Sequence, residues 1–188
     1  MKTKTKPLSY HVGNLFIVLS LLILFLIGYP IISIYLLPKT IKSEAELKGS
    51  YLTVSKIKAQ APIIFGVDPF NEGEYKKALK RGVAHAKGTP LPGERGSVFI
   101  FAHSSGNPIE IASYNTIFFR LGELEKGDEV EIKKDGKIYR YAVVDKKNVW
   151  PNEVRYLTEQ TKDQLILQTC WPVGTTLKRL LVFAEAIS

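Results

Sequence analysis

The sequence predicts an all-β domain with short helices, preceded by one transmembrane helix. An uncharged apolar run covers residues 15–37, and a helix needs only ~20 such residues to cross a bilayer. The rest of the chain contains short β-rich segments separated by turn residues, which is typical of a barrel or sandwich. Between two of these segments, Asp135-Gly136 predicts a two-residue hairpin, because a type I′ turn needs positive φ at both positions.

The apolar run favours an uncleaved anchor over a cleaved signal peptide. The apolar region of a signal peptide is only ~7–15 residues long and ends at small residues, whereas this run is longer and ends near Tyr35. Three lysines lie among the first six residues, and basic residues tend to stay on the cytoplasmic side. We therefore expect a single-pass protein of the cell membrane. Its expected parts are a cytoplasmic N-terminus at 1–14, an anchor at 15–37, a stalk at 38–50 and an extracellular domain at 51–188.

Local patterns predict the elements of the outer domain. Residues 74–81 put Tyr75, Ala78 and Leu79 at helical spacing and stop at Gly82, which predicts a short helix. Strands are expected where β-branched, aromatic and apolar residues alternate or run together. These segments are 51–58, 97–103, 129–133, 137–145, 164–170 and 179–186.

The composition excludes several classes of site and partner. The chain has one cysteine, so an intramolecular disulfide and a site of several thiolates are both impossible. The histidines stand at 11, 85 and 103, without metal-ligand spacing, and we expect neither a metal nor another cofactor. The net charge is +8, but the basic residues of the outer domain are mixed with acids and form no stripe with aromatics. We therefore expect no nucleic-acid partner.

Three reactive side chains lie at the ends of predicted strands. Cys170 and His103 end apolar segments and are followed by loops, and Arg179 begins the last segment. Rigid scaffolds often present functional groups at such positions. Each residue also has a structural explanation, because a lone cysteine is commonly a small buried hydrophobe and a terminal arginine commonly joins a surface ion pair. Residue type alone leaves the two interpretations open.

Four segments together resemble the sortase family of cysteine transpeptidases. Residues 88–103 (GTPLPGERGSVFIFAH) are similar to the family stretch that ends in the catalytic histidine, and 121–128 (LGELEKGD) to its LxxLxxGD turn. Residues 165–172 (LILQTCWP) match the LxLxTCxP segment that carries the nucleophile, and 179–182 (RLLV) match the RLxV segment that carries the catalytic arginine. The chain departs from the family pattern at Ala102, where glycine is common before the histidine. An upstream family histidine corresponds to His85, which we expect at the rim of the site and not in catalysis.

The resemblance implies a closed eight-stranded β-barrel and an acyl transfer at the cell surface. Cys170 would be the nucleophile that forms an acyl thioester, and His103 the general acid and base. Arg179 would stabilise the oxyanion or orient the substrate. Thr169 and Trp171 flank the nucleophile and are candidate substrate contacts; the alternatives are that Thr169 orients its strand and that Trp171 is a buried aromatic. The implied partners are surface proteins with a C-terminal LPxTG-like sorting signal, an amine acceptor of the cell envelope and the membrane.

Other cysteine enzymes and a non-enzymatic binding module are the alternatives to a sortase. A papain-like endopeptidase places its cysteine before its histidine, whereas His103 precedes Cys170 in this chain. An L,D-transpeptidase has the observed order but needs a nearby Ser-His-Gly-Cys string, which is absent from the sequence. The non-enzymatic alternative is a membrane-anchored β-sandwich that binds a partner and whose thiol is inert. A cysteine endopeptidase that hydrolyses without transfer is the enzymatic alternative.

Overall fold

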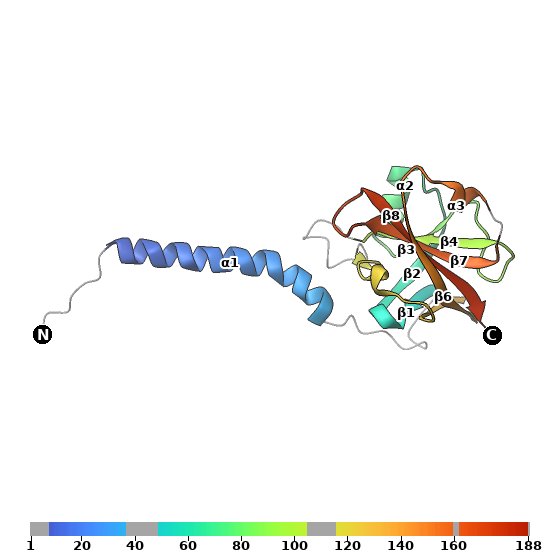
Figure 1. Cartoon of the computed structure of the whole chain (residues 1–188), viewed down its shortest axis with the longest axis horizontal. Coiled ribbons are helices and arrows are strands. Elements are labelled where there is room, and N and C mark those ends of the chain that lie inside the picture. The colour runs from blue at the N-terminus through green and yellow to red at the C-terminus, as the bar shows by residue number, and fades with distance from the viewer. Residues whose placement is uncertain (1–7, 37–48, 105–115, 160–161, 188) are drawn as a thin grey trace, which may run out of the picture. The chain divides into compact units, whose positions relative to one another are not determined.

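The computed structural model of the chain describes residues 8–36, 49–104, 116–159 and 162–187. The first of its two units contains helix α1, Leu8–Leu36 (Figure 1). Within α1, Ser9–Tyr29 is long and apolar enough to span a membrane, a test that a signal sequence also passes. The helix begins before the predicted anchor because helical hydrogen bonding continues through its polar first turns. The predicted features at residues 1–7 and 37–48 lie outside the described residues.

The second unit is a closed barrel of eight strands in the order β1-β2-β3-β4-β7-β8-β6-β5 (Figure 1). This confirms the predicted all-β barrel. The strands are β1 Tyr51–Val54, β2 Ala59–Val67, β3 Val83–Ala86, β4 Ser97–Phe101, β5 Glu129–Lys134, β6 Lys137–Val149, β7 Gln164–Trp171 and β8 Lys178–Ile187. The short helices are η2 Ser55–Ile57, α2 Glu72–Leu79, η5 Leu121–Glu123 and α3 Arg155–Thr158.

Local chemistry sets several element boundaries. The β5–β6 hairpin turns at Asp135 and Gly136, with φ of 52° and 76°, as predicted. The predicted 51–58 strand is too long, because β1 gives way to η2 and the chain turns at Lys58, whose φ is 54°. Helix α2 begins two residues before the predicted start, because the side chain of Asn71 accepts a hydrogen bond from the Glu74 amide at 3.2 Å and caps the helix.

The parallel pairing of β4 with β7 determines which residues meet at the end of the barrel. The register runs from Ser97 opposite Gln164 to Phe101 opposite Gln168. Strand β8 pairs antiparallel with the other edge of β7. Since β4 and β7 run in the same direction and β8 runs back, β4 and β7 end at the same rim where β8 begins.

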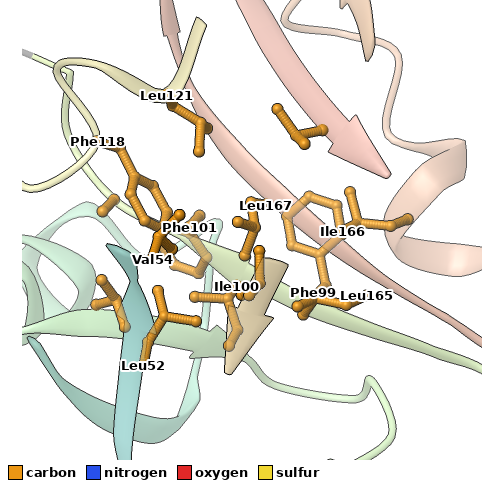
Figure 2. Close-up of a cluster of buried hydrophobic side chains, with 14 of the residues drawn as sticks. Leu52, Val54, Phe99, Ile100, Phe101, Phe118, Leu121, Leu165, Ile166 and Leu167 are labelled. Carbon is orange, nitrogen blue, oxygen red and sulfur yellow. The ribbon is translucent and has the colours of Figure 1, made fainter. Parts of the chain in front are cut away.

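Alternate residues of these strands point into the barrel and form its core. Leu165 and Leu167 of β7 are fully buried there. Figure 2 shows side chains of β1, β4 and β7 meeting Phe118 and Leu121 from the segment that precedes β5. The outer face is also partly covered. The ring of Tyr75 in α2 lies 6.4 Å from that of Phe101, and the ring of Tyr156 in α3 lies 5.7 Å from that of Phe183 in β8.

Candidate active site

Two of the three predicted catalytic residues belong to neighbouring strands, and His103 lies two residues beyond the end of β4. Cys170 in β7 lies directly opposite Arg179 in β8. On the other side of β7, the register pairs Phe101 with Gln168. Strand β4 ends at Phe101, but the Ala102 amide still donates to the Gln168 carbonyl, so the segment that carries His103 follows β7 past the end of β4. Cys170 and Arg179, flanked by this segment, are called the catalytic row below and lie on strands about 5 Å apart.

The catalytic row lies on the outer face of the barrel. Side chains of a strand alternate between its two faces, and Thr169, Leu167 and Leu165 point inward, where they are almost fully buried. Cys170 belongs to the other set, and its side chain is half-buried. Directly opposite residues of antiparallel strands share a face with Cβ atoms about 5 Å apart. Arg179 therefore lies beside Cys170 on the outer face.

Arg179 is oriented by carbonyl groups. Its Nη1 atom donates to the carbonyl oxygens of Thr176 and Lys178, at 3.1 Å each. Within the described part of the chain, no carboxylate forms an ion pair with this guanidinium. The side chain is half-buried, and a guanidinium has five N–H donors. Arg179 is thus held in place while other donors remain available for an anionic group beside Cys170.

Thr169 connects the strand of the cysteine to the segment of the histidine. It is 2% exposed, and its Oγ1 atom donates to the carbonyl of Ala102 at 3.0 Å. The Ala102 amide in turn donates to the carbonyl of Gln168 at 3.1 Å. These two bonds hold the residue before His103 against β7. The geometry favours the strand-orienting alternative for Thr169 over a direct substrate contact.

Trp171 points away from the catalytic row. It follows Cys170 in β7 and so takes the opposite face. A Cβ atom added to Gly122 would lie only 2.9 Å from Cζ3 of the Trp171 ring, so the ring packs directly on that glycine. The Gly122 carbonyl also accepts a hydrogen bond from Nζ of Lys146 at 2.9 Å. This packing favours a structural role for Trp171 and explains why the 121–128 segment adjoins the nucleophile.

Comparisons with known proteins support the family that the fold and the site residues indicate. The family model described as the sortase domain matches residues 52–187. This chain belongs to the sortase family. Its sequence is 30% identical to Sortase D of Bacillus subtilis (strain 168) over 151 residues, covering 78% of this chain and 68% of that protein. Membership of the family supports a cysteine transpeptidase activity, and sortases are generally membrane-associated.

Solved structures of other sortases share the fold. Sortase A from Corynebacterium diphtheriae superposes with a TM-score of 0.61 at 28% identity, covering 74% of this chain and 60% of that one. Clostridium perfringens sortase C, solved with the C-terminal cell wall sorting motif, gives a TM-score of 0.60 at 28% identity, with 73% and 69% covered. This sortase chain thus spans less than two thirds of the length of the C. diphtheriae enzyme.

His85 is not a rim residue of this sortase, contrary to the expectation from its sequence. It is 2% exposed, and its Nε2 atom lies 2.9 Å from the Pro90 carbonyl and 3.1 Å from Oγ1 of Thr89. The Thr89 hydroxyl already donates to the Ala86 carbonyl, so Nε2 must carry the proton. Burial lowers the pKa of His85, although the Pro90 carbonyl and Glu94 oppose the shift. His85 is a neutral histidine that holds the turn leading to β4.

The outer face of this sortase has two further features that sequence reasoning missed. Gln168 lies on the same face as Cys170, two residues before it, and its outward position follows from the alternation along β7. Further along that face, a cavity of about 380 Å³ is lined by Ile166, Phe183 and Tyr156 among others. Among the described residues, no group of three or more His, Cys, Asp or Glu side chains is placed to hold a metal ion.

Proposed function

We propose that this chain is a membrane-anchored cysteine transpeptidase of the cell surface. It cleaves a C-terminal LPxTG-like sorting signal and transfers the acyl part to an amine of the cell envelope. The observation that carries the proposal is the pairing of Cys170 with Arg179, beside the segment of His103, within a domain that matches the sortase family over residues 52–187.

In the first half-reaction, Sγ of Cys170 attacks the carbonyl carbon of the scissile Thr–Gly bond as a thiolate. A tetrahedral intermediate forms, and its oxygen carries the negative charge. His103 then protonates the leaving amine. The C–N bond breaks, and the sorted protein remains attached to Cys170 as a thioester.

In the second half-reaction, an amine acceptor attacks the thioester. His103 accepts the proton that the amine loses, the C–S bond breaks, and Cys170 is released as a thiolate. A new amide now joins the sorted protein to the acceptor.

Arg179 stabilises the oxyanion of both tetrahedral intermediates. Supporting this role, it lies opposite Cys170, has no carboxylate partner among the described residues and is oriented by two carbonyl groups. A guanidinium keeps its charge at any physiological pH. Removal of one preorganised oxyanion donor typically lowers kcat by about 10²–10³, and we expect a loss of that order for Arg179→Ala.

The catalytic domain at 51–188 works on the outside of the membrane. Two features support this topology: α1 contains a stretch able to span a bilayer, and three lysines precede it in the sequence. The partners are surface proteins that carry a sorting signal, together with the amine acceptor. Thr169 and Trp171 support the site from β7 without contacting the peptide, since both have partners within the barrel.

Mass spectrometry of the full-length protein in detergent micelles tests the proposal. The protein is incubated with an LPxTG-type peptide, with and without a glycine amine. We expect an acyl adduct on Cys170 that converts to a peptide–glycine product when the amine is present. Hydrolysis without transfer would indicate an endopeptidase. If the wild type forms no adduct and behaves like Cys170→Ala, the domain is a binding module with an inert thiol.

A further inference from the structure

Beside the catalytic row, three paired residues on β4, β7 and β8 include one polar side chain. Phe101 in β4 pairs with Gln168 in β7, and Gln168 pairs with Leu181 in β8. Phe101 is 8% and Leu181 1% exposed, whereas Gln168 is only half-buried. The Gln168 side chain shares the outer face with Cys170 and lies about 7 Å from it along the strand. A peptide that follows β7 to the thiol must therefore cover a carboxamide flanked by apolar groups.

This carboxamide has unused hydrogen-bonding capacity. The main-chain carbonyl of Gln168 accepts from Ala102, but its side chain makes no hydrogen bond within the part of the chain that the structure describes. A carboxamide offers two donors and one acceptor oxygen. A ligand that covers these groups without replacing their water contacts loses binding free energy, because the polar atoms become buried and unpaired. A polar ligand is therefore expected to bind at position 168 more tightly than an apolar one.

The two directions along the outer face suit different parts of the substrate. From the Gln168 row the face continues to Ile166 and Phe183 and to the cavity that they line. In the other direction, β7 ends at Trp171 and β8 begins at Lys178, close to the catalytic row. The acyl part must stay bound while one amine leaves and another arrives. The longer surface suits the retained acyl part, and the rim suits the exchange of amines.

Gln168 then faces the substrate residues that precede the scissile bond. An extended peptide advances about 3.3 Å per residue, so the carboxamide lies within reach of the two residues before the scissile threonine. In an LPxTG-like signal these residues are the proline and the variable residue x. A proline side chain cannot form a hydrogen bond, whereas x can carry a polar group.

We propose that Gln168 is a specificity-determining residue that selects sorting signals with a hydrogen-bonding side chain at position x. This inference rests on the proposed transpeptidase function and names the substrate class of the same site. The chemical partner is an amide or hydroxyl side chain, which satisfies both the donors and the acceptor of the glutamine.

The test compares four peptides that differ only at x, which is Asn, Gln, Leu or Met. The full-length enzyme in detergent micelles is assayed for the rate of thioester formation on Cys170. We expect the wild type to prefer the Asn and Gln peptides by about fivefold in kcat/KM, the size of one net hydrogen bond. In Gln168→Leu this preference should fall to about one, with the apolar peptides reacting faster than before. Gln60→Leu is the matched control, because this glutamine lies on β2, which pairs with neither β7 nor β8.

Each other outcome counts against the assignment. An unchanged preference in Gln168→Leu overturns it, and an equal loss on all four peptides assigns the amide to the peptide backbone and also overturns it. A wild type that forms the thioester without any preference refutes the role of Gln168 while leaving the transpeptidase intact. A wild type that forms no thioester refutes both. Gln168→Met repeats the comparison with a side chain of similar length if thermal denaturation shows that the leucine variant is unfolded.

Discussion

Thr169→Val removes one buried hydroxyl while keeping the shape of the side chain. In the wild type, Oγ1 of Thr169 donates to the Ala102 carbonyl at 3.0 Å, and both residues are buried. The valine variant leaves that carbonyl without this donor in a buried place, which costs about 1–3 kcal/mol of unfolding free energy. For a domain of this size we expect a decrease in Tm of about 3–10 °C.

The same change should lower turnover more than substrate binding. The hydrogen bond fixes the residue before His103, so its loss lets the histidine move relative to Cys170. We expect kcat for thioester formation to fall about tenfold with KM for the peptide nearly unchanged, since small errors in alignment cost rate. Thr169→Ser keeps the hydroxyl and should stay close to wild type.

Chemical denaturation and steady-state kinetics on the three proteins measure both effects. Full stability in Thr169→Val together with a raised KM would refute this reasoning. That result would instead support a direct contact between Thr169 and the peptide.

Two further perturbations test the supports of the site. Gly122→Ala introduces a Cβ atom 2.9 Å from the Trp171 ring and should lower the free energy of unfolding by about 1–3 kcal/mol in a denaturation assay. Gly73→Ala is the control. Its Cβ atom would lie 3.6 Å from the nearest neighbour, and the variant should be close to neutral in the same assay. Burial lowers the pKa of His85 in the folded protein. Below about pH 6.5 the unfolded chain therefore binds a proton more readily than the folded protein does, and the free energy of unfolding should fall as the pH is lowered. His85→Gln should weaken this pH dependence in denaturation curves recorded from pH 5 to 8, and an identical slope in both proteins would contradict it.

Much of the barrel could be predicted from local patterns, but not β2 and β3. Strand β2 contains Pro62 and Gly66, and β3 consists of only four residues, two of them alanine. Proline, glycine and alanine are all depleted in strands. These segments extend because they pair with each other in parallel and with β1 and β4 on their outer edges. Such long-range pairing leaves no local periodic signal.

The positions of the supporting residues likewise depend on tertiary contacts. Asparagine is a common helix cap. With Asn71 taken as the cap that bonds Glu74, the start of α2 could have been predicted from the sequence. The burial of His85 follows instead from its contacts with the 89–90 turn. No feature of the linear sequence distinguishes such a buried histidine from one at a rim.

The sequence by itself determined the apolar helix, the hairpin at Asp135-Gly136 and the identity of Cys170, His103 and Arg179 as candidates. These depend on local composition, turn chemistry and short motifs, which remain readable along the chain. Only the tertiary structure decided that Cys170 and Arg179 share one row and that the segment of His103 follows β7, because these arrangements come from the pairing of β7 with β8 and with β4. The structure also distinguished Gln168 from other polar residues, because strand pairing places it between two buried apolar neighbours.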